Sequence, residues 1–228
     1  MRPVPRVHVV TDDAVLERSG FPDEARRVME AGGAAVAFHV RGPGTSGRIL
    51  HDVALGLRRI GRDTGTMLVV NDRVDVALAL GLDGVHLGAR SLPVDVALSL
   101  LPEGTRVGAS THGPEEAGAA EASGAHYLFV GAVFETPSHA GREGGGTALV
   151  RRVRARTTVP LVGIGGIEVG RVAEVLAAGA HGVALIRGVW QTPDPAEAVA
   201  RLVEAVERAE PLDGAAPPPR ATPDTPAG

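Results

Sequence analysis

The feature that most constrains this chain is a regular alternation of short apolar runs with longer segments of helical period. Eight such runs occur, and each is nearly continuous in hydrophobic, often β-branched residues rather than alternating between apolar and polar ones. This pattern is typical of strands that are buried on both faces of a parallel sheet. The runs span residues 7–11, 35–40, 67–70, 84–87, 106–109, 126–130, 159–163 and 182–186.

The intervening segments predict helices, with amphipathic stretches at 22–31, 47–63 and 114–123. The last of these begins with proline followed by two glutamates, which suits the first turn of a helix. Eight strand–helix units in about 210 residues predict a single (β/α)8 TIM barrel, with eight parallel strands ringed by helices. A doubly wound open sheet is the alternative. It would show a glycine-rich fingerprint after the first strand, where this chain has Thr11-Asp12-Asp13.

Composition restricts the chemistry and the partners. The sequence contains no Cys, and all 23 basic residues are Arg, which excludes a Schiff-base lysine, a Walker-type phosphate loop and cysteine-held metals. A net charge of −4 argues against nucleic-acid binding. No apolar run approaches the ~20 residues that span a bilayer, so we expect a cytoplasmic protein without a membrane partner. We expect residues 1–210 to form the domain and the Pro- and Ala-rich residues 211–228 to form a disordered tail.

Segments that contain glycine follow each of the last three predicted strands. Gly165-Gly166 comes after the seventh and Arg187-Gly188 after the eighth, where backbone amides of a TIM barrel can cradle a phosphate. Tight turning of the chain is the alternative use of these glycines. The long segment 131–146 after the sixth strand predicts a mobile lid over an anionic ligand, with plain disorder as the alternative.

Asn71 and Asp72 follow the third strand and offer oxygen ligands at the same rim. Asp72 could hold Mg²⁺ bridged to a phosphate. The alternative is a helix N-cap at the start of residues 74–80. A dedicated Mg²⁺ site normally needs a second carboxylate, and the segment after the fourth strand offers Ser91 instead.

Histidines are the candidate proton carriers. His112 follows the fifth strand, and an imidazole works as acid or base near neutral pH. Its alternative is a helix-start residue bonded to backbone. We expect His39 and His86, inside apolar runs, to pack in the barrel interior, and His8 to be structural or exposed. Zinc-ligand spacing is absent from the sequence.

Six motifs together are highly specific. Residues 10–12, 71–79, 83–88, 108–112, 131–136 and 162–167 read VTD, NDRVDVALA, DGVHLG, GASTH, GAVFET and VGIGGI. In this order, over residues 7–208, they resemble the thiamine phosphate synthase and TenI superfamily of small TIM barrels. The resemblance implies one of two activities. The synthases join an aminopyrimidine pyrophosphate to a thiazole phosphate, whereas the TenI branch comprises thiazole tautomerases that aromatise a carboxythiazole phosphate.

Three departures from the synthase pattern favour the TenI branch. The resemblance places lysines after the second and sixth strands and a second Mg²⁺-binding aspartate after the fourth, where this chain has Pro43, His139 and Ser91. A synthase must stabilise a departing pyrophosphate with metal and cations. A tautomerase moves only a proton. We therefore expect a TenI-like thiazole tautomerase without a cofactor.

On this interpretation His112 transfers the proton, and Arg41 or Ser110 orients the substrate carboxylate. The phosphate of the thiazole substrate would bind at Gly165, Gly166, Arg187 and Gly188. The alternative is a thiamine phosphate synthase, in which Mg²⁺ and pyrophosphate would be bound by Asn71, Asp72, Ser110, Thr136 and Ser138. A third alternative is a non-catalytic regulator that binds thiazole or thiamine phosphate. The resemblance also implies a homodimer.

Overall fold

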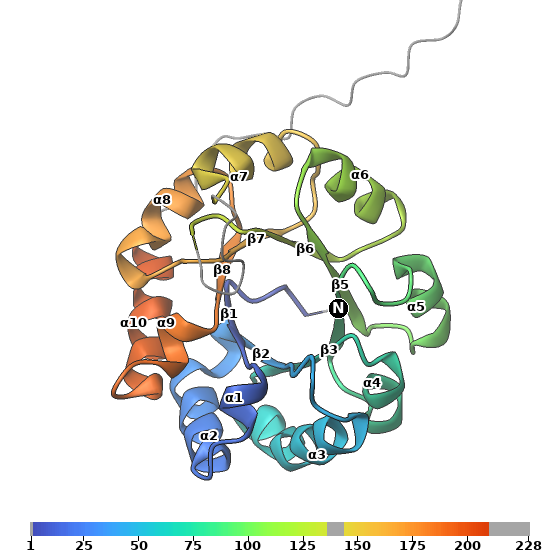
Figure 1. The fold of residues 1–228 in the computed structure, drawn as a ribbon, viewed down its shortest axis with the longest axis vertical. Coiled ribbons are helices and arrows are strands. Elements are labelled where there is room, and N and C mark those ends of the chain that lie inside the picture. The colour runs from blue at the N-terminus through green and yellow to red at the C-terminus, as the bar shows by residue number, and fades with distance from the viewer. Residues whose placement is uncertain (1, 136–143, 210–228) are drawn as a thin grey trace, which may run out of the picture.

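Eight parallel strands close into a barrel, in the order of the sequence, with β8 paired back to β1 (Figure 1). The computed structural model describes residues 2–135 and 144–209. The strands are β1 (Val7–Val10), β2 (Val36–Val40), β3 (Met67–Asn71), β4 (Gly84–Leu87), β5 (Arg106–Thr111), β6 (Tyr127–Val130), β7 (Leu161–Ile164) and β8 (Gly182–Leu185). The predicted TIM barrel is therefore confirmed, and the open sheet is wrong.

Helices surround the barrel as the amphipathic segments predict (Figure 1). The long predicted helices are present. The Ser46 hydroxyl accepts a hydrogen bond from the third backbone N–H of α3, and Gly65 ends that helix in a left-handed conformation. The helices are α1 (Asp13–Leu16), α2 (Phe21–Gly32), α3 (Gly47–Thr64), α4 (Val74–Leu80), α5 (Val94–Leu100), α6 (Pro114–Ala122), α7 (Gly146–Arg154), α8 (Val172–Ala177), α9 (Arg187–Trp190) and α10 (Pro195–Arg208), with 3-10 turns at Gly33–Ala35 and Val169–Arg171.

The barrel interior is filled by side chains. Every second strand residue points inward, and an inner cluster of Val4, Val10, Tyr127, Phe129, Val162 and Ala184 fills part of the space. Gly108 is required here, because a Cβ on it would lie 2.2 Å from the ring of Tyr127. The interior also holds His8, His39 and His86, each at most 1% exposed.

The amino-terminal end of the barrel is closed by the first residues of the chain, which cross this opening before entering β1 (Figure 1). Val4 is buried against the inner cluster, and His181 donates a hydrogen bond from Nε2 to the Val4 carbonyl over 2.9 Å. Arg6 donates to the backbone oxygen of Val206 over 3.0 Å. The large cavity described below therefore opens at the opposite end of the barrel.

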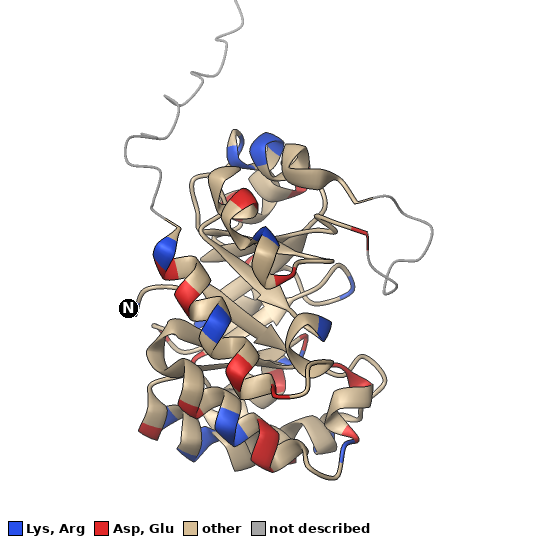
Figure 2. Cartoon of the chain, turned by 90° about the vertical axis from the view of Figure 1, so that its left-hand side faces the viewer, with Lys and Arg blue, Asp and Glu red and all other residues tan. Residues whose placement is uncertain are grey.

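Charged residues of both signs are interspersed along the outer helices shown in Figure 2. Several form pairs one helical turn apart, such as Arg26 with Glu30 on α2. None of the helices in the described residues is long and apolar enough to cross a bilayer. The predicted tail at 211–228 and the centre of the predicted lid lie outside the residues that the structure describes.

Candidate functional site

A cavity of about 1040 Å³ opens at the carboxyl ends of the strands, where a TIM barrel places its active site. Its volume is at the upper end of the range for small-molecule sites. Every predicted site residue that the structure describes lines it. These residues are Arg41, Asn71, Asp72, Ser110, His112, Gly165, Gly166, Arg187 and Gly188. Thr136 and Ser138, predicted to bind substrate, lie outside the described residues.

Asp72 is aimed at the cavity rim rather than at a helix. It has a positive φ of 64°, and its Oδ1 accepts hydrogen bonds from the Gly88 N–H, over 2.9 Å, and from the Ser91 hydroxyl. The N-cap position of α4 is instead Arg73, which makes no capping bond through its side chain. The N-cap interpretation of Asn71-Asp72 is therefore wrong. Ser91 does stand beside Asp72, as its place after the fourth strand predicts.

Asn71 connects the cavity to a line of buried histidines. Its side-chain amide lies 3.0 Å from Nδ1 of His39, whose Nε2 lies 2.9 Å from Nδ1 of His8. His8 in turn donates from Nε2 to the carbonyl of Pro5 over 2.9 Å, at the closed end of the barrel. Burial lowers the pKa of His39 to about 4, and burial followed by the proximity of His39 holds the pKa of His8 well below its usual value.

Ser110 is held by a second buried histidine. Nε2 of His86 lies 2.9 Å from the Ser110 hydroxyl oxygen. Burial, and to a smaller extent the neighbouring His39 and Arg41, keep the pKa of His86 well below its usual value. Because a neutral imidazole has one donor and one acceptor, His86 can either donate a hydrogen bond to the Ser110 hydroxyl or accept one from it.

Arg41 follows β2 and brings a permanent positive charge to the rim. Its backbone is fixed by Thr11 at the end of β1. The Thr11 hydroxyl accepts from the Arg41 N–H over 2.8 Å and donates to the Arg41 carbonyl over 2.7 Å. Pro43, two residues further on, also lines the cavity and brings no charge.

His112 lies at the rim, half exposed, and pairs with a carboxylate on the next helix. Oε2 of Glu116 accepts from the His112 backbone N–H over 2.8 Å and lies 3.1 Å from ring Nδ1. The partner is therefore a side chain, not the backbone oxygen of the alternative interpretation. With Nδ1 donating to the carboxylate, Nε2 carries the lone pair, which is the form that accepts a proton.

On the opposite side of the cavity, glycines allow two segments of backbone to approach closely. Gly165 and Gly166 have φ values of 100° and 61°, and a Cβ on Gly166 would lie 2.5 Å from the carbonyl of Glu135. The β6–α7 segment is tied to β7 here, since Phe134 donates its N–H to Gly165 O over 2.9 Å. These glycines thus serve the turn, and their binding of a phosphate stays a prediction.

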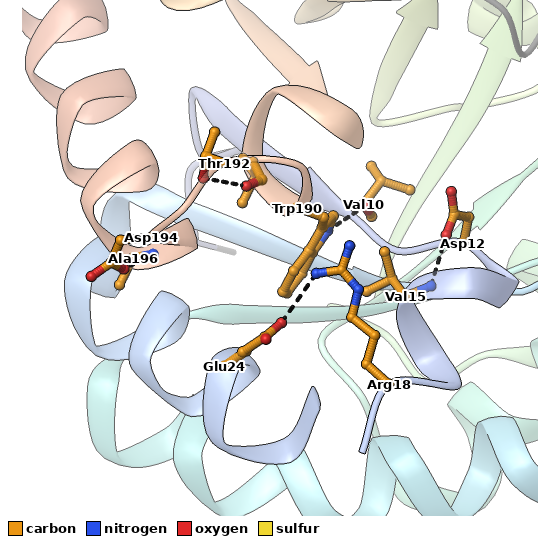
Figure 3. A network of polar contacts seen from close by, with 10 residues as sticks. Val10, Asp12, Val15, Arg18, Glu24, Trp190, Thr192, Asp194 and Ala196 are labelled. Atoms are coloured by element: carbon orange, nitrogen blue, oxygen red, sulfur yellow. Dashed lines mark hydrogen bonds and ion pairs between the residues drawn. The ribbon is translucent and has the colours of Figure 1, made fainter. Parts of the chain in front are cut away.

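The predicted phosphate residues after β8 begin the short helix α9, whose position is set by the one Trp of the chain. Trp190 is 1% exposed and donates from Nε1 to the Val10 carbonyl over 2.9 Å (Figure 3). Gly188 is confined, because a Cβ there would meet Leu185 at 2.8 Å. Arg187 and Gly188, at the start of this helix, line the same cavity as Gly165 and Gly166.

Sequence reasoning missed two members of the site. Glu116 was noted only as an acid in the first helical turn, although its spacing of four residues from His112 places both on one helix face. His8 was expected to be structural or exposed; it is structural, but its place in the buried line that reaches Asn71 was not predicted. His39 and His86 pack in the interior as predicted.

The fold and the cavity together define a small (β/α)8-barrel protein with a large cavity at the carboxyl rim. A family model described as thiamine monophosphate synthase matches residues 7–189. This chain belongs to that family. It is 40% identical over 206 residues to a thiamine-phosphate synthase of Methanoculleus marisnigri, covering 90% of this chain and 96% of the relative. A thiamine-phosphate synthase of Methanoregula boonei is also 40% identical, covering 90% and 94% of the two chains.

Solved structures agree with the assignment. A thiamine phosphate pyrophosphorylase from Pyrococcus furiosus superposes with a TM-score of 0.78 at 33% identity, covering 90% of this chain and 96% of that one. A 3-hexulose-6-phosphate synthase from Salmonella typhimurium superposes with a TM-score of 0.68 at 14% identity, covering 90% and 100%, which shows the fold alone. The named relatives are synthases, so they favour the synthase alternative over the tautomerase expected from the sequence.

Proposed function

We propose that this protein is a thiamine-phosphate synthase. In this reaction the ring nitrogen of thiazole phosphate forms a bond to the exocyclic methylene carbon of the aminopyrimidine. The bond from that carbon to the pyrophosphate oxygen breaks, and pyrophosphate leaves with the electron pair. The observation that carries the proposal is the identity of 40% over 90% of the chain to proteins named thiamine-phosphate synthase.

The residues around Asp72 fit Mg²⁺, the metal that a synthase implies. They offer a carboxylate and a hydroxyl, which are hard oxygen ligands, and Mg²⁺ is commonly held by one or two carboxylates plus substrate phosphates. Asp72 and Ser91 would hold the ion. When bound, Mg²⁺ neutralises charge on the departing pyrophosphate. In the described part of the chain, no group of three or more His, Asp or Glu side chains could hold a metal by itself, so substrate oxygens would complete the shell.

The remaining cavity residues supply orientation and charge. Arg41 lines the same cavity as Asp72 and adds a positive charge, which is present whether or not a metal ion is bound. The hydroxyl of Ser110, held by His86, offers a hydrogen bond to the substrate. The amides near Gly166 and Gly188 would anchor the thiazole phosphate, leaving its ring nitrogen directed at the pyrimidine.

A thiazole tautomerase is the second candidate. The pairing of His112 with Glu116 at the rim favours it, because a carboxylate-oriented imidazole suits proton transfer. The uncharged Pro43, in the position of a synthase lysine, also favours it. On this candidate His112→Ala would lower the rate of ring aromatisation by roughly 10²–10⁴-fold.

The test is to supply each set of substrates to the purified protein and identify the products by chromatography. We expect thiamine phosphate and pyrophosphate in equal amounts from the aminopyrimidine pyrophosphate and thiazole phosphate, with EDTA abolishing the reaction. Aromatisation of the carboxythiazole phosphate without any thiamine phosphate would overturn the proposal and establish the tautomerase. Tight binding with no turnover of either set would establish the regulator.

A further inference from the structure

The line of hydrogen bonds from Pro5 through His8 and His39 to Asn71 has a direction that chemistry fixes. At its closed end the Pro5 carbonyl accepts only, so Nε2 of His8 carries the proton. A neutral His8 then has a bare lone pair on Nδ1, and the proton between the two rings belongs to Nε2 of His39. Nδ1 of a neutral His39 is therefore an acceptor, and it faces the amide of Asn71.

An acceptor at His39 requires a donor from Asn71. Oδ1 of Asn71 lies 3.0 Å from Nδ1 of His39, and a carboxamide can turn over so that its NH2 group takes the place of its oxygen. Only the NH2 end donates, so two neutral histidines require the amide to be turned over. The orientation with Oδ1 toward His39 would need an additional proton on His8 or His39.

The surroundings oppose that proton. Both rings are 0% exposed, so an imidazolium ion at either position would lose its hydration. The other ionisable groups that act on His8 are His86 and His181, which would also add positive charge. Among the described residues, no carboxylate is paired with either ring to offset an imidazolium charge.

We propose that His8 and His39 are positioning residues that hold the Asn71 amide with its NH2 group toward the barrel interior and its carbonyl oxygen toward the cavity. Asn71 lines the cavity and is 7% exposed, so the outward-facing atom is accessible to a ligand. This part of the wall then accepts a hydrogen bond. It suits an amino or hydroxyl group and repels a phosphate oxygen, which has no proton to give. The direct pyrophosphate contact expected of Asn71 in a synthase would therefore not be made through this atom.

Under the proposed function, the matching group is the amine of the aminopyrimidine, because thiazole phosphate carries none. Only this choice of ligand group rests on the proposed function. The direction of the hydrogen bonds follows from His8, His39 and Pro5 alone.

The first test needs no substrate. Nitrogen-15 NMR of the imidazole rings at pH 7 distinguishes protonated from bare nitrogens. We expect both His8 and His39 to be neutral and protonated at Nε2. A proton on Nδ1 of His39, alone or together with one on Nε2, would overturn the proposal. Loss of synthase activity would leave this result intact, so the failures of the two proposals are distinguishable.

The second test reverses the direction of the hydrogen bond between His39 and Asn71. His8→Phe keeps an aromatic ring among Tyr127 and Phe129 but removes the acceptor for His39. To avoid a buried N–H without a partner, His39 should move its proton to Nδ1, turning the NH2 group of Asn71 toward the cavity. We expect this tautomer change by NMR, together with a rise of about tenfold in KM for the aminopyrimidine pyrophosphate and an unchanged KM for thiazole phosphate.

The matched control is Tyr127→Phe. Tyr127 packs against the same ring of His8, yet its hydroxyl has no hydrogen-bond partner within the described residues. This variant should keep the Nε2 tautomer of His39 and the KM of wild type. An unchanged tautomer in folded His8→Phe would overturn the proposal, and a changed tautomer with unchanged KM would overturn the amine as the ligand group. If His8→Phe does not fold, the wild-type spectrum decides.

Discussion

The two sides of the cavity differ in what they present to a ligand. The side formed by the ends of β2–β5 presents side chains, among them Arg41, Asp72 and Ser110. The side formed by the ends of β7 and β8 presents backbone at Gly165 and Gly188. Any substitution replaces a side chain, whereas only a substitution to proline removes a backbone N–H. A change of chemistry by substitution is therefore expected on the first side, whereas the phosphate anchor proposed for the second side depends on backbone.

The largest effect is expected on the side of the cavity that presents side chains. Asp72→Asn keeps the hydrogen-bond acceptor for Gly88 but removes the carboxylate proposed to hold Mg²⁺. We expect kcat/KM for thiamine phosphate formation to fall by roughly 10²–10³-fold, measured by steady-state kinetics over a range of Mg²⁺. The control Asp75→Asn removes an exposed carboxylate paired with Arg73 and should leave kcat/KM near wild type. Equal losses in both variants would contradict the assignment.

Low pH should lower the free energy of unfolding through the buried histidines on the side of the cavity that presents side chains. Burial lowers the pKa of His39 from its usual 6.5 to about 4 and lowers those of His8 and His86 in the same direction. Between these pH values the unfolded chain binds more protons, so the stabilisation is complete above pH 6.5 and is lost as the pH falls toward 4. His39 alone accounts for about 3 kcal/mol over this window.

The measurement is the free energy of unfolding by urea at intervals from pH 7 to 4.5. The part of this range above about pH 5 lies above the pH at which most carboxylates take up protons, so a loss of stability there reports the histidines. A variant with His39→Gln should show a shallower pH dependence. A flat profile in the wild type would show that the rings are not held neutral.

The backbone side should respond to a single added methyl group. Gly166→Ala places a side chain at φ 61° and 2.5 Å from the Glu135 carbonyl, which should destabilise the fold by about 1–3 kcal/mol and raise KM for thiazole phosphate. Chemical denaturation and kinetics measure the two effects. Gly56→Ala, in open space on α3, is the matched control and should stabilise by about 0.5–1 kcal/mol.

The smallest effect expected is a gain on the side-chain side. Ser91→Asp would place a second carboxylate next to Asp72, whose Oδ1 the serine hydroxyl contacts in the native chain. We expect the Mg²⁺ concentration for half-maximal activity to fall by about tenfold, about 1.4 kcal/mol, as measured by metal titration. An increase in that concentration would place the ion elsewhere in the cavity.

The strands could be predicted closely because their apolar runs are nearly continuous, with the largest differences at β5 and β7. The run at 106–109 continues to Thr111, and the run at 159–163 begins as a strand only at Leu161. The short helices α1 and α9 were not predicted, since four residues are too few to show a helical period.

Site residues were predicted where the barrel itself dictates position, at the strand ends. The contacts between them were not, because they depend on how far each strand is shifted relative to the next. That shift pairs Val10 with His39 and Asn71 with His86. It is what makes His8, His39 and Asn71 neighbours although they are far apart in the sequence. Asp72 was weighed as an N-cap for the same reason, because its neighbours in space could not be predicted from the sequence.

Trp190 has a practical consequence for all of these measurements. It is the one tryptophan of the chain, it is fully enclosed, and its indole N–H is bonded to the last residue of β1 (Figure 3). Selective excitation therefore reads the fluorescence of one indole at the seam between β8 and β1. Its emission wavelength should report whether this seam is closed, and because Trp190 is the last residue of α9, binding of thiazole phosphate at the start of this helix should be detectable without an added dye.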